Sequence, residues 1–285
     1  MRLHRRGFLA VAGCAALVPH AAYARVAGIE GALAATGDAR FVAIGERHDN
    51  PAHQAGQAAL VKALQPAGIA FEMIPHEHEE TVNRLRREGA SREAIAAALD
   101  WAQSGWPDFP RYAAILEAAP EAYIAGGGLS RETLSAVHAE GAPGLGPEMT
   151  ARYGLDASLS PAVGAAMLDE QYEAHCGLLD RARLAPMVAV QRAWDAAYAE
   201  AWRRAGLRGE GRAVLICGNV HARMETGSPA YLARAMPDTI IAAIGQTEEG
   251  DGFPPAGFYT ATLQAPRPER EDACERMRAS MGRSE

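Results

Sequence analysis

The fold of this chain is decided by one stretch, Phe41-Val42-Ala43-Ile44-Gly45-Glu46-Arg47-His48-Asp49-Asn50-Pro51. Its first four residues form a short apolar run, which is typical of a buried strand. Asn50 is a favourable N-cap and Pro51 a favourable first residue for a helix. The stretch therefore predicts a strand that ends near an acid and a histidine and leads directly into a helix.

Two later apolar runs repeat this pattern. Ile69-Ala70-Phe71 is followed by Glu72, and Val214-Leu215-Ile216 leads through a short turn to His221. Because helical stretches separate the runs, we predict an α/β fold with a mainly parallel central sheet, flanked by helices and carrying helical insertions. Residues just beyond the carboxyl ends of parallel strands face a common crevice. The sequence thus predicts a shared site formed by four side chains: Glu46, His48, Glu72 and His221.

The rest of the chain fits one domain, at about residues 25–265. Further strands are expected near residues 122–125, 239–245 and 259–263. Helices are expected near residues 51–65, 77–87, 91–101, 109–118, 161–180, 186–205 and 229–235, and after Ser130. The helices of segments 77–118 and 160–206 are the insertions. Residues 266–285 are polar and rich in charge, so we expect a mobile C-terminal tail.

The first 24 residues have the anatomy of a bacterial export signal. A twin-arginine pattern at residues 5–9 precedes an apolar run, and Ala22-Tyr23-Ala24 resembles a cleavage site. The apolar run is too short for a permanent membrane span. We therefore predict a periplasmic protein, exported by the twin-arginine route and cleaved after Ala24. Residues 11–14 also resemble a lipoprotein box, so a lipid anchor at Cys14 is the alternative.

Charge and cysteine content exclude several classes of protein. The net charge is −7, and removal of residues 1–24, which hold three arginines and no acid, changes it to −10. An acidic protein is a poor partner for nucleic acid. The remaining cysteines, Cys176, Cys217 and Cys274, are odd in number and widely spaced, which predicts neither a disulfide framework nor a zinc knuckle. Cys217 lies in a predicted strand and is expected in the core.

Several motifs in this order resemble those of the ChaN-type haem-binding proteins, bacterial members of the Tiki and erythromycin-esterase-like superfamily. They are residues 45–51, Phe71-Glu72-Met73, Ser104-Gly105-Trp106-Pro107, His175-Cys176-Gly177 and Gly218-Asn219-Val220-His221. The resemblance covers about residues 38–245. It implies an envelope location, haem binding linked to iron uptake, and contact with other envelope haem-uptake components, and it leaves a homodimer open.

Haem would be bound without a covalent link, because the sequence has no C-x-x-C-H motif. Tyr112 and His175 lie in the aromatic helical insertions, where they could approach a porphyrin, and a phenolate suits ferric iron. Alternatively, Tyr112 packs in the insertion with its hydroxyl bonded to backbone. The predicted haem-binding residues are His48, His53, Tyr112, His175 and His221.

A hydrolase is the alternative function for the same crevice. A divalent metal held by Glu46, His48, Glu72 and His221 would lower the pKa of a bound water. Without a metal, a histidine could remove a proton from water while a carboxylate orients the ring. His48 and His53 are five residues apart, so they do not form the i, i+4 pair of a helical zinc site. Both could still point into the crevice, or His53 could be solvated.

Overall fold

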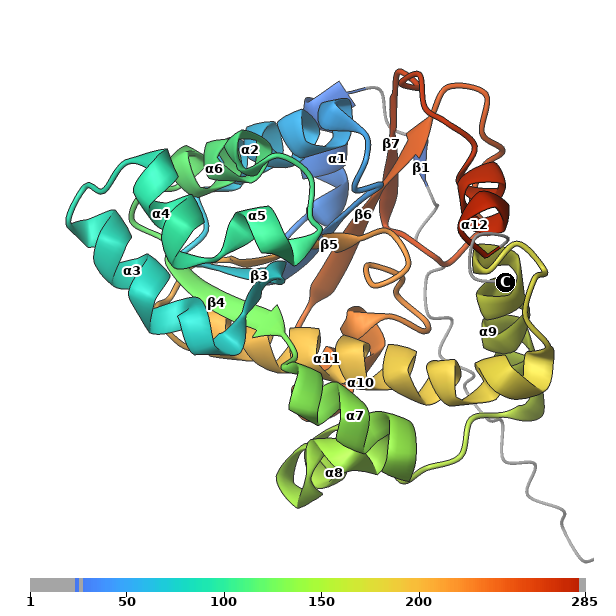
Figure 1. Cartoon of the computed structure of the whole chain (residues 1–285). Coiled ribbons are helices and arrows are strands. Elements are labelled where there is room, and N and C mark those ends of the chain that lie inside the picture. Colours follow the sequence, from blue (N-terminus) through green and yellow to red (C-terminus); the bar gives the residue numbers. More distant parts are fainter. Residues whose placement is uncertain (1–23, 26–27, 282–285) are drawn as a thin grey trace, which may run out of the picture.

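The computed structural model describes residues 24–25 and 28–281, and its centre is one seven-stranded sheet (Figure 1). The strand order is β1-β7-β6-β2-β5-β3-β4, and each neighbouring pair is parallel. The α/β fold with a mainly parallel sheet is therefore confirmed. The predicted export signal lies outside the described residues, apart from Ala24 in β1.

Most predicted elements are present with shifted ends. The strands are β1 (Ala24–Arg25), β2 (Phe41–Glu46), β3 (Gly68–Pro75), β4 (Tyr123–Gly128), β5 (Ala213–Gly218), β6 (Ile241–Glu248) and β7 (Ala261–Ala265). The helices are α1 (Gly28–Thr36), α2 (Pro51–Leu64), α3 (Glu79–Arg87), α4 (Arg92–Ala98), α5 (Trp101–Ser104), α6 (Phe109–Ala118), α7 (Arg131–Glu140), α8 (Pro147–Tyr153), α9 (Pro161–Ala174), α10 (Arg181–Gly206), α11 (Ser228–Ala235) and α12 (Ala273–Met281). The sequence did not predict β1, α1, α8 or α12. None of the described helices has the length and apolar character needed to cross a membrane.

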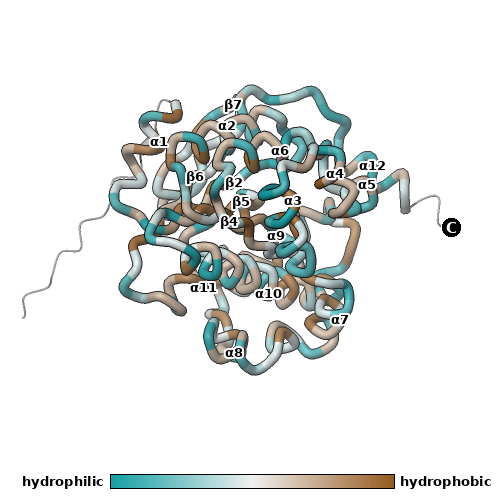
Figure 2. The backbone as a smooth tube through the Cα atoms, turned by 90° about the vertical axis from the view of Figure 1, so that its left-hand side faces the viewer, coloured by the Kyte–Doolittle hydropathy of each residue, from teal (hydrophilic) through white to brown (hydrophobic). Residues whose placement is uncertain are grey.

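The sheet is the middle layer between two layers of helices. Figure 2 shows β2, β4 and β5 in the centre, with α2 and α6 on one side and α10 and α11 on the other. Alternate residues of β2 face the two layers: Val42 and Ile44 pack in one core cluster, and Phe41 and Ala43 pack in the other. Phe41 meets the Trp202 ring of α10 edge to face at 5.5 Å between centroids. All six β2 residues are buried, as expected for a central parallel strand.

Helix α10 begins earlier than the sequence predicted. The sequence predicted a start at Pro186, where proline has no cost, but α10 begins at Arg181 and contains Pro186. Proline lacks the N–H of a helical hydrogen bond, so it usually marks a helix start. Here the helix continues through it because most residues after Val190 are buried against β3, β4 and β5. Tertiary packing therefore outweighs the local cost of the proline.

The glycines at residues 126–128 belong to β4 rather than to a loop after it. A Cβ on Gly126 would lie 2.5 Å from the carbonyl oxygen of Pro75, and one on Gly127 would lie 2.8 Å from the Tyr198 ring. Such distances are too short for any side chain. The glycines therefore let β3 and α10 approach β4 closely.

The described part of the predicted mobile tail, residues 266–281, contains a helix that the sequence did not predict. This helix is α12, which lies beside α9 (Figure 1). Cys274 of α12 forms a disulfide with Cys176, which follows α9. The cysteine pattern implied no disulfide framework and gave no sign of this single bridge, because two cysteines 98 residues apart give no pairing signal in the sequence. Cys217 is free and buried, as predicted.

Candidate functional site

The four side chains predicted to share a site do meet, at the carboxyl edge of the sheet. Strands β2, β5 and β3 are adjacent in that order, so their carboxyl ends lie together. Glu46 ends β2, Glu72 lies in β3, and a turn after β5 carries His221. Glu72 Oε1 lies 3.6 Å from His221 Nε2 and 3.9 Å from His48 Nε2. We call the site formed by Glu46, His48, Glu72 and His221, together with the side chains bonded to them, the crevice.

Glu46 organises one side of the crevice. Its Oε1 accepts hydrogen bonds from the Tyr112 hydroxyl at 2.8 Å and from His48 Nδ1 at 2.7 Å. Its Oε2 accepts one from Gln54 Nε2 at 2.7 Å. Because a carboxylate only accepts hydrogen bonds, the proton on the His48 ring must be at Nδ1 when that ring is neutral. The other ring nitrogen, Nε2, then faces the crevice with its lone pair.

Glu72 is held by the backbone of β5. Its Oε2 accepts a hydrogen bond from the Gly218 N–H at 2.6 Å, and its Oε1 accepts one from the Tyr198 hydroxyl at 3.3 Å. A Cβ on Gly218 would lie 3.0 Å from His48 Nε2. The absence of a side chain at this position therefore leaves room for both the His48 ring and the Glu72 carboxylate.

His221 is paired with a buried aspartate from α10. Its Nδ1 lies 2.8 Å from Asp195 Oδ1, and the Gln191 amide lies 3.0 Å from the same ring nitrogen. Burial alone would lower the pKa of His221, but the charges of Glu72 and Asp195 together raise it to about 9. The ring is therefore an imidazolium at neutral pH, with a proton on each nitrogen.

The sequence did not assign Gln191, Asp195 or Tyr198 to this site. Their spacing of four and three residues places them on one side of α10, among buried alanines. Polar residues at helical spacing within a small-residue face are the signal that could have identified them.

His48 is the most accessible ionisable side chain of the crevice, with 35% of its side chain exposed against 6% for Glu72. Its ring lies edge-on to Trp106, with centroids 4.9 Å apart. Burial lowers the pKa of His48, but the hydrogen bond to Glu46 and the charges of Glu72 and Glu46 outweigh this and raise it overall. His48 and Trp106 thus form the accessible side of the crevice.

Three other predicted haem-binding residues are placed differently. His53 is fully buried: its Nδ1 accepts from the Arg47 N–H at 2.8 Å, and its Nε2 lies 3.4 Å from the Thr247 carbonyl oxygen. Burial also lowers the pKa of His53. Tyr112 is buried, and burial together with the charge of Glu46 raises its pKa strongly. Its hydroxyl bonds to a carboxylate rather than to backbone.

His175 follows α9, at the turn that precedes α10. Its Nδ1 lies 2.7 Å from the Gln171 carbonyl oxygen, one turn earlier in the chain. Among the described residues, no hydrogen bond, ion pair or ring contact joins His175 to the four side chains predicted to share the site. The structure therefore does not place His175 in contact with the crevice.

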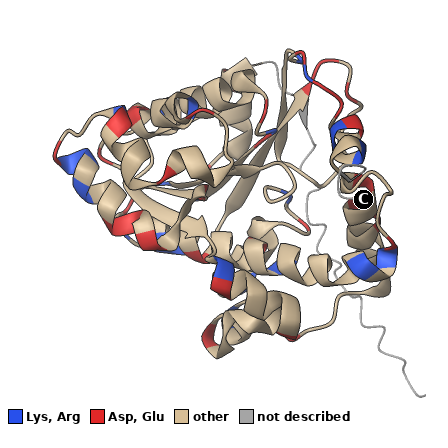
Figure 3. Cartoon of the chain, in the orientation of Figure 1, with Lys and Arg blue, Asp and Glu red and all other residues tan. Residues whose placement is uncertain are grey.

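The crevice does not have the geometry of a metal centre. Within residues 24–25 and 28–281, no group of three or more His, Cys, Asp or Glu side chains is arranged to hold a metal ion. Glu46, Glu72 and His221 instead form hydrogen bonds with protein partners: Glu46 with Tyr112, Glu72 with the Gly218 N–H, and His221 with Asp195. Acidic and basic residues are frequent on outer helices such as α3 (Figure 3).

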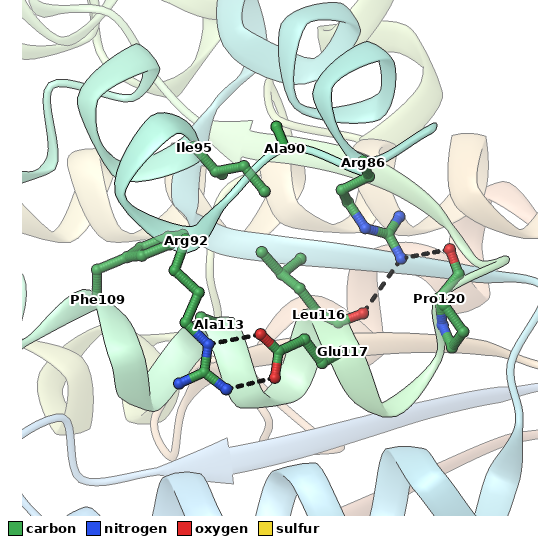
Figure 4. Close-up of a pocket in the computed structure, with 9 residues that line it drawn as sticks. All are labelled: Arg86, Ala90, Arg92, Ile95, Phe109, Ala113, Leu116, Glu117 and Pro120. Atoms are coloured by element: carbon green, nitrogen blue, oxygen red, sulfur yellow. Dashed lines mark hydrogen bonds and ion pairs between the residues drawn. The ribbon is translucent and has the colours of Figure 1, made fainter. Parts of the chain in front are cut away.

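A separate pocket of about 150 Å³ lies between α3, α4 and α6 (Figure 4). Phe109 and Leu116 form part of its apolar lining. Its cations are already bonded within the wall: Arg86 donates to backbone carbonyls that include Leu116 and Pro120, and Arg92 pairs with Glu117. Because Arg86, Arg92 and Glu117 already bond to one another or to backbone, we do not assign a catalytic or ligand-binding role to this pocket.

Comparisons with known proteins agree with this fold. The family model described as "Haem-binding uptake, Tiki superfamily, ChaN" matches residues 32–232. The chain is similar to a solved structure described as "Cofacial heme binding to ChaN of Campylobacter jejuni", at 16% identity and a TM-score of 0.64, over 81% of this chain and 89% of that one.

More distant similarities are found to the type III effector HopBA1 and to the erythromycin esterase EreC. The first has 15% identity and a TM-score of 0.47 over 88% of this chain and 99% of that one. The second has 12% identity and a TM-score of 0.40 over 79% and 76%. No curated protein sequence matches the chain. At 16% identity the Campylobacter jejuni structure bears on the fold alone, and the other two, whose TM-scores are below 0.5, add no support to it.

Proposed function

Because the chain belongs to the ChaN haem-binding uptake family of the Tiki superfamily, we propose that it is an envelope protein that binds haem non-covalently, with the iron held in the crevice. The similar structure from Campylobacter jejuni is described as binding haem cofacially. Haem supplies an iron centre on a flat apolar ring, so its site needs a ligand atom beside aromatic surface. The arrangement of His48 carries this proposal.

The residues around His48 fit a haem iron. The bond from Nδ1 to Glu46 fixes the ring and leaves Nε2 as the possible ligand atom. Glu72 Oε1 lies 3.9 Å from Nε2, which is beyond hydrogen-bond distance, so Glu72 does not engage this nitrogen. A carboxylate behind a ligating imidazole is the usual support for such a ligand. Trp106 adds aromatic surface beside the ring.

The other predicted ligands suit positioning roles better. His221 has no free lone pair as an imidazolium, since its pKa is about 9. Tyr112 remains a neutral phenol because its pKa is raised, and its hydroxyl already donates to Glu46. Both ring nitrogens of His53 are within bonding distance of backbone atoms. We therefore propose that His48 binds the iron. Tyr112 orients Glu46 through its hydrogen bond.

Titration of the purified mature chain with ferric haem tests this proposal through the Soret band. His48→Ala should weaken haem binding by at least about 100-fold, because losing a ligand costs more than the 10–100-fold typical of its supporting residues. Tyr112→Phe should weaken it by about tenfold with little spectral change. His175→Ala, outside the crevice, serves as the matched control and should leave the spectrum unchanged.

Two results would contradict the assignment. An altered Soret band in Tyr112→Phe together with an unchanged one in His48→Ala would place the iron in the insertion. Absence of a Soret shift for the wild-type chain would refute haem binding itself. Far-UV circular dichroism of each variant separates these results from loss of folding.

The disulfide supports the proposed periplasmic location. Disulfides persist in oxidising compartments such as the bacterial periplasm and are rare in the cytosol. Changing Arg5 and Arg6 to lysine should trap the precursor in the cytoplasm, as seen by cell fractionation. The mass of the mature protein distinguishes cleavage after Ala24 from lipid attachment at Cys14. Normal export of the double variant would refute the twin-arginine route.

A homodimer and contact with envelope haem-uptake components are further parts of the proposal. The accessible side of the crevice, with the half-exposed His48 and Trp106, is the surface that such partners would reach. Light scattering of the chain with and without haem tests the homodimer. A mass that stays at one chain under both conditions would exclude it.

A histidine-assisted hydrolase is the second candidate, favoured by the buried Asp195–His221 pair. As an imidazolium, His221 could donate a proton to a leaving group, while Glu72 beside it could accept one from water. The metal-assisted version has no support among the described side chains. Cleavage of an aryl ester by the haem-free protein, abolished in His221→Gln, would support the hydrolase. A rate equal to buffer would exclude this activity toward aryl esters.

A further inference from the structure

Gln54 of α2 is a buried member of the crevice, with only 1% of its surface exposed. Its Nε2 donates to Glu46 Oε2 at 2.7 Å and to the His48 carbonyl oxygen at 3.1 Å. The Arg47 carbonyl oxygen lies 3.5 Å from the same nitrogen. A side-chain amide has two N–H groups, and the two shorter bonds use both of them. Gln54 is therefore bonded both to a carboxylate of the crevice and to the loop that follows β2.

These bonds close a ring of hydrogen bonds that begins and ends at His48. The His48 imidazole donates from Nδ1 to Glu46 Oε1, the other oxygen of that carboxylate accepts from Gln54, and Gln54 donates to the His48 carbonyl. Tyr112 also donates to Glu46, but among the described residues no hydrogen bond joins Tyr112 to the His48 backbone. Gln54 is thus the side chain that holds both the backbone of His48 and the acceptor of its ring.

The orientation of the Gln54 amide follows from the chemistry of its partners. The Glu46 carboxylate and the two backbone carbonyls all accept hydrogen bonds. Turning the amide by 180° would place its Oε1 against these three oxygen atoms, so that acceptor would face acceptor. In the observed orientation, Oε1 accepts no hydrogen bond from the described residues. Gln54 therefore acts in the crevice as a donor only.

Gln57, which lies one turn later on α2, has a similar environment without a bond to the crevice. It is fully buried, and its Oε1 also accepts no hydrogen bond from the described residues. Its Nε2 donates to the Ile44 carbonyl at 3.0 Å, two residues before Glu46 in β2. Both glutamines therefore attach α2 to the end of β2, but only Gln54 bonds to a side chain of the site. This difference separates a structural role from a role in the crevice.

We propose that Gln54 is a positioning residue that determines which ring nitrogen of His48 is available to the haem iron. A neutral imidazole carries its proton on the nitrogen that has an acceptor, and the other nitrogen keeps its lone pair. While Gln54 holds Glu46, this acceptor faces Nδ1 and Nε2 stays free. Without Gln54, the carboxylate is free to turn away from Nδ1, and the two tautomers mix. The effect on haem rests on the proposed function, whereas the tautomer is a property of the haem-free protein.

Nitrogen-15 NMR of the His48 ring tests the tautomer in the haem-free protein, at a pH high enough to make the ring neutral. The wild-type ring should be protonated at Nδ1. Gln54→Met keeps the length of the side chain but removes the donor, so both tautomers should be seen. Gln57→Met is the matched control and should keep the wild-type pattern. A wild-type pattern in Gln54→Met, or equal mixing in the two variants, would overturn the proposal.

Haem titration measures the consequence for binding. Gln54→Met should weaken haem binding by about 10–100-fold, the range for residues that orient a metal ligand, and Gln57→Met should leave it unchanged. Because Gln54 acts through Glu46, its loss should cost less affinity in a Glu46→Gln background. Equal costs in both backgrounds would overturn the proposal.

Two further outcomes are distinguishable. If circular dichroism shows that Gln54→Met does not fold, Gln54→Asn gives the same test, because its shorter amide cannot reach both Glu46 and the His48 carbonyl. A wild-type chain that binds no haem would refute the proposed function and leave the NMR result on His48 intact.

Discussion

Two groups of carboxylates, each around a buried glutamate, lie along the same edge of the sheet, and their partners differ. Strand β6 is adjacent to β2 and ends at Glu248, just as β2 ends at Glu46. Glu248 is surrounded by arginines, whereas Glu46 and Glu72 meet histidines and tyrosines. We call the arginine-bound group the Glu248 cluster. Its members are Glu248, Asp251 and Asp49 with Arg47, Arg267 and Arg270.

The balance of charge distinguishes the two groups. In the Glu248 cluster, three carboxylates face three arginines, whose charge is permanent. In the crevice, the carboxylates of Glu46, Glu72 and Asp195 face only two histidines, whose charge depends on pH. Fixed pairs hold the fold together at one part of the edge. The crevice has more carboxylates than cationic partners, and the charge of those partners changes with pH. This part of the edge is therefore better suited to binding a ligand.

The largest predicted effect is at the Glu248 cluster. The Glu248 side chain has no exposed surface and bonds to Arg47, Arg270 and Asn50. Glu248→Gln removes the charge that these arginines face, so we expect the unfolding free energy to fall by about 3 kcal/mol, the low end for a broken buried pair because the arginines are partly exposed. Urea denaturation of the haem-free protein measures this loss.

The adjacent exposed acid supplies the control for that experiment. Glu249→Gln removes the same charge one residue away from the cluster, where the side chain is exposed. It should leave the stability unchanged within about 0.5 kcal/mol, as is usual at the surface. Equal losses in the two variants would show that net charge, rather than the arginine contacts, stabilises this end of β6.

The second prediction is that the two groups lose stability at opposite ends of the pH range. The pKa of His221 rises from 6.5 to about 9 on folding. Its contribution is therefore complete below pH 6.5 and is lost as the pH rises to 9. We expect a loss of about 2 kcal/mol over this window, less than the roughly 3.4 kcal/mol that the full shift would give. His221→Gln should remove this alkaline loss.

The Glu248 cluster should respond to acid instead. Burial raises the pKa of Glu248, but bonds from Arg270 and Asn50 outweigh it and lower the pKa below 4.5 overall. The stability that it contributes is present above pH 4.5 and is lost as the pH falls through the folded value. Urea denaturation from pH 3 to pH 10 measures both arms. An alkaline loss that persists in His221→Gln would contradict the assignment to the crevice.

Much of this edge could be predicted from sequence. Polar residues after three apolar runs placed Glu46, His48, Glu72 and His221 together, because parallel strands share a carboxyl edge. The same rule could not separate His48 from His53, since both lie near the start of α2. Only the packing shows that the His53 ring bonds to backbone while His48 faces the crevice.

The missed features depend on contacts between distant segments. Asp195 reaches His221 from α10, and its helical spacing indicates a shared face with Gln191 and Tyr198 but not which strand end that face meets. The Cys176–Cys274 disulfide and the position of α12 depend on how α9 and α12 pack beside each other. Local propensity carries no information on such pairings. Asp195 and Cys176 lie in the insertion of residues 160–206, and Cys274 lies in the C-terminal segment; neither segment contains a predicted strand end.

The smallest predicted effect is at Glu72, where the same substitution as at Glu248 should be nearly neutral. In Glu72→Gln the amide oxygen can still accept from the Gly218 N–H, and the crevice loses one of its excess acids. The pKa of His221 should fall, because the charge of Glu72 is one of the causes that raise it. A neutral His221 Nε2 can then accept from the new amide. We expect the stability at pH 7 to change by less than about 1 kcal/mol, since residues at functional sites are often not the most stable choice. NMR titration of the His221 ring and urea denaturation test both parts. A loss near that of Glu248→Gln would show that the crevice carboxylates stabilise the fold as the arginine-bound ones do, and the distinction between the two groups would fail.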